Sequence, residues 1–246
     1  MSETTCEIRT ADGTVDGYLF RPESGAPAPG VLLLTDAGGI REANRKLSAR
    51  LANAGYVVLL PNVFYRTTRP PTFTFRPDFS DERTRKRFAE LAGPLTPDAI
   101  ERDAAAFLEL LRSTSGVSPG PVGVVGYCFT GGYALRVAAA YPDTVAAAAS
   151  FHGGGLCTDA PTSPHRVLSR VKARLYFGHA DQDRSMPKDS IDKLAAALAA
   201  WGGKFESEIY PGAAHGWTSE DSAIYHPAHA ERAYSKLTEL FQATLR

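Results

Sequence analysis

A cysteine lies between a short apolar segment and an alanine-rich one. The sequence around it reads Val122-Gly123-Val124-Val125-Gly126-Tyr127-Cys128-Phe129-Thr130-Gly131-Gly132. This order is typical of the nucleophile elbow, in which a strand is followed by a small residue, the nucleophile, and then small residues that lead into a helix. Here cysteine stands in place of serine. A helix N-terminus favours a thiolate, and the amide of Phe129 can bind the oxyanion of a tetrahedral intermediate. We therefore predict that Cys128 is a nucleophile rather than a buried structural cysteine.

A nucleophile on such an elbow is followed along the chain by an acid and then by a histidine. His215 stands in a loop of small residues, Pro211-Gly212-Ala213-Ala214-His215-Gly216, after a predicted strand at residues 205–210. We predict that it is the general base, which takes a proton and then returns it to the leaving group. The alternative is a solvent-exposed loop histidine. His152, which follows an apolar segment and precedes three glycines, is a second histidine that could face the site.

The acid of this series is expected in the segment Leu175-Tyr176-Phe177-Gly178-His179-Ala180-Asp181-Gln182-Asp183. A carboxylate there can fix the tautomer of the histidine and stabilise the imidazolium. Asp181 and Asp183 both qualify. The strand is expected to end at Gly178, and the shorter distance from that end favours Asp181.

The segments around these residues alternate between strand and helix patterns. Continuous apolar runs are typical of strands buried on both faces, and helical periodicity with capping residues marks the helices. Strands are predicted at residues 6–10, 15–20, 31–34, 56–60, 122–125, 145–151, 174–177 and 205–210. Helices are predicted at residues 41–54, after Thr96-Pro97, and at 129–140, 188–201 and 228–244, and residues 61–97 are expected to form a surface excursion with a short helix.

This alternation predicts an α/β fold with a mostly parallel sheet that has helices on both faces. Together with the elbow, it indicates the α/β-hydrolase fold. No internal repeat and no linker divide the chain, so we expect a single domain over residues 1–246.

Composition limits the partners of the chain. Lys plus Arg and Asp plus Glu are both 27, so no net field would hold nucleic acid or an anionic membrane. The polar start and the lack of a long apolar stretch predict a cytoplasmic protein. We expect it to be a monomer or a homodimer. The cysteines Cys6, Cys128 and Cys157 lie too far apart for a disulfide framework or a CxxC metal pattern.

With these residues in this order, the chain resembles the dienelactone hydrolase (carboxymethylenebutenolidase) family along nearly its whole length. The most specific matches are Gly126-Tyr127-Cys128, Thr35-Asp36-Ala37-Gly38-Gly39 and Ala214-His215-Gly216. The resemblance implies hydrolysis of a lactone ring by a Cys–His–Asp triad, without a metal or another cofactor.

The resemblance also implies roles for three residues of the first half of the chain. Asp36 stands where the family carries a glutamate that holds the resting thiol, and the amide of Ala37 is then the second oxyanion donor. Arg85 matches an arginine that binds the substrate carboxylate. Two positions depart from the family pattern: Thr130 replaces a usual glycine, and Ser219 replaces a second substrate-binding arginine.

Two other functions remain open from the sequence. The first is a general carboxylesterase or thioesterase that acts on an uncharged small molecule, which the missing arginine favours. The second is a hydrolase-fold protein that binds a small molecule without catalysis. The order of nucleophile, acid and base argues against the second, because a receptor has no need for a base.

Overall fold

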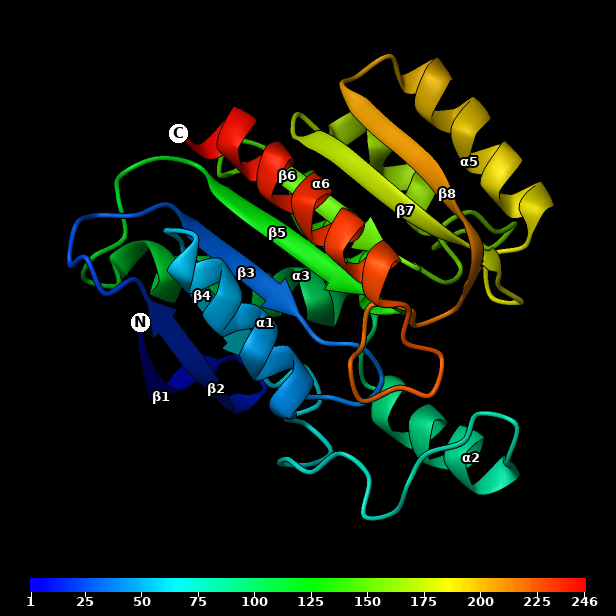
Figure 1. Ribbon diagram of the computed structural model, residues 1–246, viewed down its shortest axis with the longest axis horizontal. Coiled ribbons are helices and arrows are strands. Elements are labelled where there is room, and N and C mark those ends of the chain that lie inside the picture. Colours follow the sequence, from blue (N-terminus) through cyan, green and yellow to red (C-terminus); the bar gives the residue numbers. More distant parts are fainter. The chain divides into compact units, whose positions relative to one another are not determined.

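The computed structural model of the chain describes residues 1–246. These residues form two compact units, Met1–Ser118 and Pro119–Arg246. Both units combine strands with helices that pack on them (Figure 1). The structure confirms the predicted α/β class, with mostly parallel strands and helices on both faces of the strands. A single domain over residues 1–246 stays a prediction.

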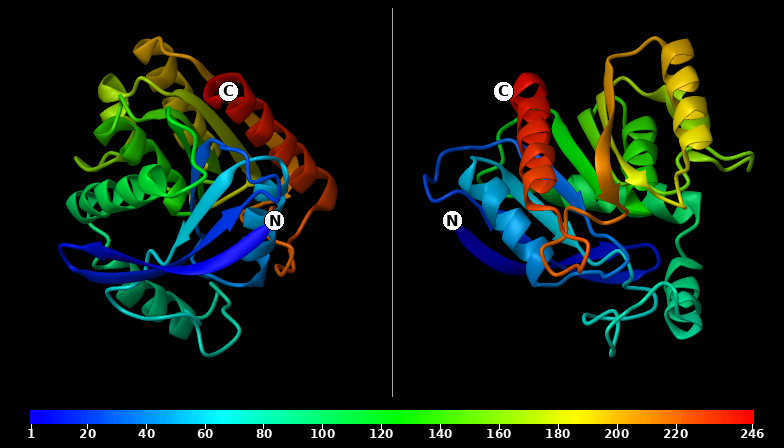
Figure 2. Two further views of the ribbon diagram at one scale, coloured as in Figure 1. Left: turned by 90° about the vertical axis from the view of Figure 1, so that its left-hand side faces the viewer. Right: turned by 45° about the vertical axis from the view of Figure 1, so that its right-hand side comes forward.

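The strands of the first unit begin with a long hairpin. β1 (Ser2–Thr10) pairs antiparallel with β2 (Gly13–Arg21) along its whole length, and the left panel of Figure 2 shows this dark blue ribbon lengthwise. β2 pairs antiparallel with β4 (Val57–Pro61), and β4 pairs parallel with β3 (Gly30–Leu34). Every residue of β3 and β4 is buried, as expected for continuous apolar runs.

Three helices belong to the first unit. α1 (Glu42–Asn53) packs against β2 and β4, whereas α3 (Pro97–Ser113) packs against β1, β3 and β4. Figure 1 shows α1 in front of these strands and α3 behind them. The predicted start of α3 is confirmed, because the Thr96 hydroxyl accepts a hydrogen bond from the amide of Ala99 at 3.2 Å. The short helix expected within the surface excursion is α2 (Glu82–Ala92).

The second unit has four parallel strands. They lie in the order β5 (Val122–Tyr127), β6 (Val145–Phe151), β7 (Arg174–Gln182) and β8 (Phe205–Ala214). β7 and β8 both continue beyond their predicted ends at residues 177 and 210. The pairing of β7 with β8 reaches Gln182 and Ala214, with one irregularity after Ala180. This extension determines which side chains follow the strands at the site.

The helices of the second unit are α4 (Thr130–Ala140), the 3₁₀ helix η1 (Pro164–Arg170), α5 (Lys188–Trp201) and α6 (Pro227–Leu245). α6 packs against β5, β6 and β7 and lies in front of them in Figure 1. α4 packs against β5 and β6 and also contacts η1, which in turn contacts α5. Helices therefore pack on each of the strands β5, β6 and β7 of the second unit.

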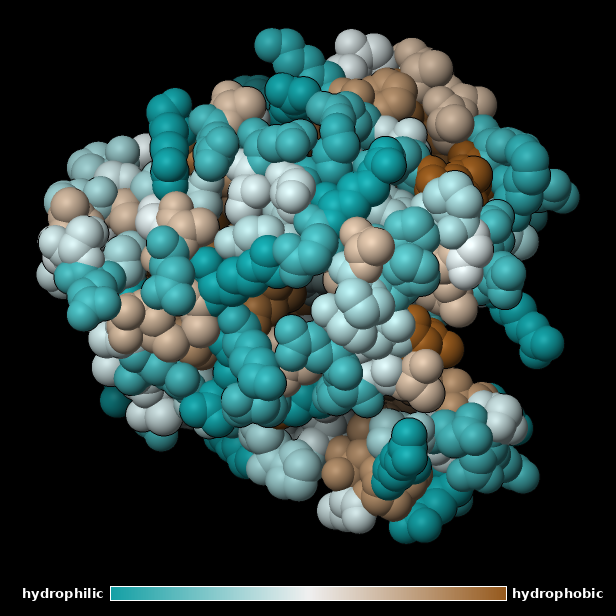
Figure 3. All heavy atoms as spheres, viewed as in Figure 1, coloured by the Kyte–Doolittle hydropathy of each residue, from teal (hydrophilic) through white to brown (hydrophobic).

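Hydrophilic side chains cover most of the face shown in Figure 3, and apolar atoms occur there in separate small areas. None of the helices is both long enough and apolar enough to cross a membrane.

Candidate active site

Cys128 directly follows β5 and lies two residues before the first residue of α4. Its φ of 59° lies in the left-handed region, which is unusual for a residue with a side chain and marks a backbone held in place by its surroundings. Gly126 permits the tight turn, because a Cβ atom there would lie 2.1 Å from the carbonyl oxygen of Thr130. The predicted strand, turn and helix around Cys128 are confirmed.

Thr130, a departure from the family pattern, closes this turn. Its buried hydroxyl accepts a hydrogen bond from the amide of Tyr127 at 2.9 Å and donates one to the Tyr127 carbonyl oxygen at 2.9 Å. Glycine at this position would offer neither bond. The substitution therefore adds contacts that hold the elbow and does not disturb its conformation.

His215 follows directly on β8 and contacts a carboxylate from the end of β7. Its Nδ1 lies 2.6 Å from Oδ2 of Asp183, and the other carboxylate oxygen accepts bonds from the amide of Ser185 at 2.7 Å and from its hydroxyl at 2.6 Å. Burial favours the neutral carboxyl, but the bonds from His215 and Ser185 hold the pKa of Asp183 below its ordinary value. Asp183 is therefore an anion that fixes the orientation of the histidine ring.

His215 also makes a side-chain hydrogen bond with Cys128. Because Nδ1 is engaged by Asp183, Nε2 is the ring nitrogen that serves the thiol. Burial alone would lower the pKa of His215, but the bonds and charges of Asp183 and Cys128 raise it to about 10. The three side chains thus form one hydrogen-bonded line from carboxylate to imidazole to sulfur.

Asp181, which the sequence favoured as the acid, has a different place. Its Oδ2 accepts a hydrogen bond from the amide of Gly212 at 2.9 Å. The prediction was wrong because β7 does not end at Gly178: Asp181 is still within the strand, and the first carboxylate beyond the strand is Asp183. Asp181 instead holds β8 near its end, three residues before His215.

The chain beyond His215 is anchored as well. The amide of His226 donates to the carbonyl oxygen of Trp217 at 3.0 Å, and the Trp217 side chain is fully buried. His229 adds a bond from Nε2 to the carbonyl oxygen of Pro211 at 3.0 Å. The loop that carries His215 is therefore fixed on both sides of the histidine.

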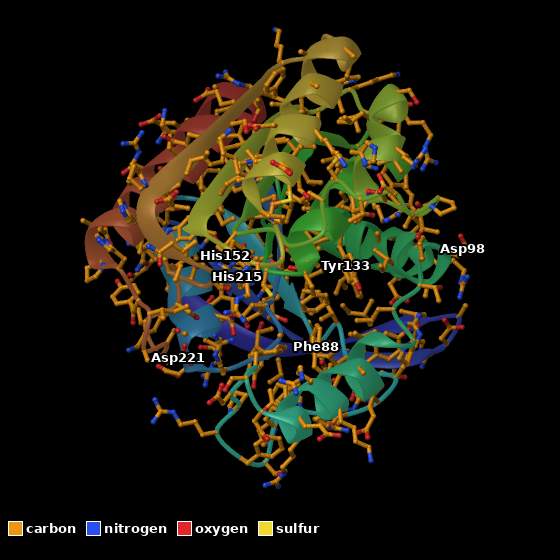
Figure 4. The ribbon with its side chains drawn as sticks, turned by 90° about the vertical axis from the view of Figure 1, so that its right-hand side faces the viewer. Phe88, Asp98, Tyr133, His152, His215 and Asp221 are labelled. Atoms are coloured by element: carbon orange, nitrogen blue, oxygen red, sulfur yellow. The ribbon has the colours of Figure 1, made fainter.

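His152 is the second histidine of the site, as the sequence suggested. Figure 4 labels His152 next to His215, and their imidazole rings meet edge to face, with 5.1 Å between their centroids. His152 is almost fully buried and contacts the backbone of Cys128 as well as Thr218. Neither Thr218 nor Ser185 was singled out from the sequence, although Asp183-Arg184-Ser185 matches an Asx turn, in which an aspartate accepts from the amide two residues on.

The other predicted site residues belong partly to the first unit. Phe129 directly precedes α4 in the second unit, whereas Ala37 is buried in the first. Asp36 forms a two-pronged ion pair with Arg41, at 2.6 Å and 2.8 Å, and accepts a bond from the amide of Gly38. The roles of Phe129 and Ala37 in oxyanion binding and of Asp36 toward the thiol stay predictions.

Arg85 lies on α2, and its guanidinium is bonded to backbone. It donates to the carbonyl oxygens of Phe79 at 3.2 Å and of Ser80 at 2.5 Å. Ser219, at the position of the second expected arginine, donates its hydroxyl to Asp221. The predicted contact of Arg85 with a substrate carboxylate therefore stays a prediction, and the guanidinium has other partners in this structure.

Comparison with known proteins places this arrangement in a family. Residues 15–245 match the model of the dienelactone hydrolase family. A Synechocystis protein named "Putative carboxymethylenebutenolidase" is 28% identical over 235 residues, which is 94% of this chain and 93% of that protein. A Rhodococcus opacus protein named "Carboxymethylenebutenolidase" is 27% identical over 231 residues, covering 93% of this chain and 86% of its own.

A solved structure from Klebsiella pneumoniae, described as a "Putative Dienelactone Hydrolase", superposes with a TM-score of 0.87. It is 22% identical and covers 98% of both chains, which confirms the predicted α/β-hydrolase fold. The match of the family model covers the elbow, the acid and the histidine alike. The chain therefore belongs to the dienelactone hydrolase family and is a hydrolase of carboxylic esters or lactones.

Proposed function

We propose that the protein hydrolyses a small-molecule lactone or carboxylic ester by nucleophilic catalysis, with Cys128, His215 and Asp183 as the triad. The observation that carries this proposal is the hydrogen-bonded line from Asp183 through His215 to Cys128. The strained elbow supports it, because it presents the sulfur at the N-terminus of α4. Asp183 takes the place that the sequence assigned to Asp181.

In the first half of the reaction, Sγ of Cys128 attacks the carbonyl carbon of the substrate while its proton rests on Nε2 of His215. The raised pKa of His215 favours this state, because the imidazolium lies between two anions, the thiolate and the Asp183 carboxylate. The tetrahedral intermediate then expels the alkoxide, which takes the proton from His215. The result is a thioester on Cys128 and a freed hydroxyl group, which in a lactone stays attached to the acyl part.

In the second half, His215 removes a proton from water, and the hydroxide attacks the thioester carbon. The second tetrahedral intermediate expels the thiolate of Cys128 and releases the carboxylic acid. The amides of Phe129 and Ala37 are the proposed donors to the oxyanion in both halves. Asp183 keeps its charge throughout and stabilises the imidazolium.

A neutral ester or thioester is the second candidate substrate, and the surroundings of Arg85 favour it. Both hydrogen bonds of its guanidinium go from Nη1 to backbone carbonyl oxygens, and Ser219 replaces the second arginine of the family pattern. These bonds fix the guanidinium against its own backbone, so a carboxylate-bearing lactone would have to reach Nε and Nη2 in that position. A neutral ester makes no such demand.

The test compares a dienelactone with p-nitrophenyl acetate as substrates of the wild type and of Cys128→Ala. Hydrolysis of either by the wild type, lost in the variant, supports the proposed chemistry. A wild type that binds these compounds without turning them over would support a non-catalytic binding protein. Turnover by a folded Cys128→Ala protein would overturn the proposed nucleophile.

Arg85→Ala then separates the two substrates. If its bonds to Phe79 and Ser80 are its main role, kcat/KM should fall by less than about threefold on both compounds, the scale of an exposed neutral-acceptor bond. A loss of about thirtyfold confined to the dienelactone would assign Arg85 to the substrate carboxylate, since a charged bond contributes ~2 kcal/mol. Arg83→Ala, on the same helix, is the matched control.

A further inference from the structure

His152 takes no part in the proposed reaction, yet it is buried at the centre of the site. It follows β6 directly, and its φ of 40° is the only left-handed value of a non-glycine residue besides that of Cys128. Its amide donates to the carbonyl oxygen of Gly178 at 2.7 Å, which fixes the backbone to β7. The two non-glycine residues with a left-handed backbone therefore follow two neighbouring strands, β5 and β6.

The imidazole of His152 joins the nucleophile to the histidine loop. Its Nδ1 accepts a hydrogen bond from the amide of Cys128 at 3.1 Å. The same amide also donates to the carbonyl oxygen of Phe151, at 3.1 Å. An accepting Nδ1 carries no proton, so the ring hydrogen is on Nε2 and is donated to Oγ1 of Thr218 at 2.8 Å. Thr218 follows the buried Trp217 on the segment that carries His215.

The bond to Cys128 requires a neutral ring, because an imidazolium would donate at both nitrogens. Burial and the neighbouring His215 keep the pKa of His152 well below its ordinary value, against the opposing pull of Asp183. The other ionisable side chain near it is that of Tyr127, whose ring centroid lies 6.0 Å from that of His152. The site therefore contains two neighbouring histidines of opposite character: His152 is held neutral, and His215 readily takes a proton. Their ring centroids lie 5.1 Å apart.

We propose that His152 is a positioning residue for the nucleophile: by accepting the amide of Cys128, it holds the elbow in its left-handed conformation and keeps Sγ within reach of His215. Two neighbours hold the imidazole of His152 in turn. They are the ring of Trp217, whose centroid lies 5.0 Å from that of His152, and the hydroxyl of Thr218. The expected effect of His152 on turnover rests on the proposed function. The expected effect of His152 on the reactivity of the Cys128 thiol is independent of that function.

The experiment compares three variants of position 152 that separate the acceptor from the backbone conformation. Asn places an acceptor oxygen near the former Nδ1 and tolerates a positive φ. Leu has a similar size without an acceptor, and Gly relaxes the backbone without an acceptor. If the acceptor matters, His152→Asn keeps the reactivity of Cys128, whereas His152→Leu and His152→Gly both lose it.

The first measurement is the rate at which iodoacetamide alkylates Cys128 at neutral pH, followed by mass spectrometry of each cysteine peptide. Cys6 and Cys157 are internal references, because burial raises the pKa of Cys6 to about 11 and raises that of Cys157 as well. We expect the Leu and Gly variants to alkylate at Cys128 on the order of tenfold more slowly than the Asn variant, the effect of one neutral hydrogen bond. Equal rates in the three variants would overturn the proposal.

Turnover of p-nitrophenyl acetate is the second measurement on the same proteins. Because the amide of Cys128 does not bind the substrate in the proposed mechanism, the loss in the Leu and Gly variants should fall on kcat and leave KM within about twofold, as for an interaction made only in the transition state. A loss confined to KM would make His152 a wall of the substrate pocket and would overturn the positioning role.

Thr218 gives a test that leaves the buried ring in place, should the Leu or Gly variant fail to fold. Thr218→Val removes the acceptor of the Nε2 hydrogen at nearly constant volume, and Thr218→Ser retains it. We expect slower alkylation of Cys128 in Thr218→Val and recovery in Thr218→Ser. Rates that do not differ between Val and Ser would contradict the proposed chain of contacts.

The two proposals fail in different ways. If wild-type Cys128 alkylates rapidly and the variants show the expected order, but no ester is hydrolysed, the proposed function fails and the positioning role stands. If the wild type hydrolyses the ester and all variants of position 152 alkylate alike, the function stands and the positioning role is wrong.

Discussion

His215 and Asp183 are joined by a hydrogen bond of 2.6 Å between Nδ1 and Oδ2, although they come from the ends of two different strands. This bond leaves Nε2 of the imidazole to face the thiol. It also decides between the two aspartates that the sequence offered, because Asp181 is bonded to the amide of Gly212.

Asp183→Asn should therefore lower kcat far more than Asp181→Asn. The asparagine amide at position 183 can no longer stabilise an imidazolium, so we expect a loss of about a hundredfold or more. Asparagine at position 181 keeps an oxygen that can accept from Gly212, so we expect less than about a threefold change. Steady-state hydrolysis of p-nitrophenyl acetate measures both, and the opposite ranking would return the role of the acid to Asp181.

Cys128→Ala and His215→Ala should each abolish most turnover, by about a thousandfold or more, and the double variant should be little worse than either. Side chains that act as one unit show such non-additive losses. The comparison needs circular dichroism to establish that the three proteins are folded. Cys6→Ala and Cys157→Ala serve as controls with turnover near that of the wild type. Losses that multiply in the double variant would mean that Cys128 and His215 act separately.

The pKa of His215 should depend on both of its partners. Nuclear magnetic resonance titration of the wild type should give a pKa of about 10. In Cys128→Ala the contribution of the Cys128 side chain is lost, so the pKa of His215 should fall but stay above its ordinary value of 6.5, because Asp183 remains. In Asp183→Asn it should fall as well. A pKa that is unchanged in Cys128→Ala would show that the thiol and the imidazole do not interact.

The same titration has a consequence for stability, which is simplest to observe in Cys128→Ala. A histidine whose pKa is raised by folding stabilises the fold fully below the pKa of the unfolded chain, near 6.5, and loses that contribution as the pH rises through the folded pKa. The free energy of unfolding in urea should therefore decline above pH 6.5. The decline should be smaller in the Cys128→Ala/His215→Gln double variant, and parallel profiles would contradict this link.

Thr130→Val should lower the free energy of unfolding by ~1–3 kcal/mol. The valine removes the partner of the buried Tyr127 amide and of its carbonyl oxygen at nearly constant volume. Thr130→Ser keeps the hydroxyl and should cost less. Urea unfolding of the three proteins measures the difference, and a valine variant as stable as the serine variant would show that the hydroxyl does not hold the elbow.

Local patterns in the sequence were sufficient for most of the fold and for two of the three side chains in the line from Asp183 through His215 to Cys128. The elbow around Cys128 was readable because strand, glycine and helix are adjacent in the chain. His215 was readable because it follows a predicted strand and a run of small residues, although residues 211–214 of that run belong to β8. Both signals depend on neighbours in the sequence.

The acid could not be placed in the same way. Gly178 and the polar residues after it suggested a strand end, but β7 continues to Gln182 because it pairs with the extended β8. Pairing between distant segments leaves no local pattern, so the position of a strand end, and with it the choice between Asp181 and Asp183, required the structure. The contacts of His152 with Cys128 and Thr218 are equally non-local.

The double anchoring of the histidine loop separates the segment that holds His215 from the one that follows it. Asp181 holds Gly212 near the end of β8, and beyond His215 the amide of His226 bonds to the carbonyl oxygen of Trp217. Residues 219–225 lie between the two residues that this second bond joins. The length of this segment can therefore change, in directed evolution or in natural divergence, while the bond between Trp217 and His226 closes it and the imidazole keeps its place.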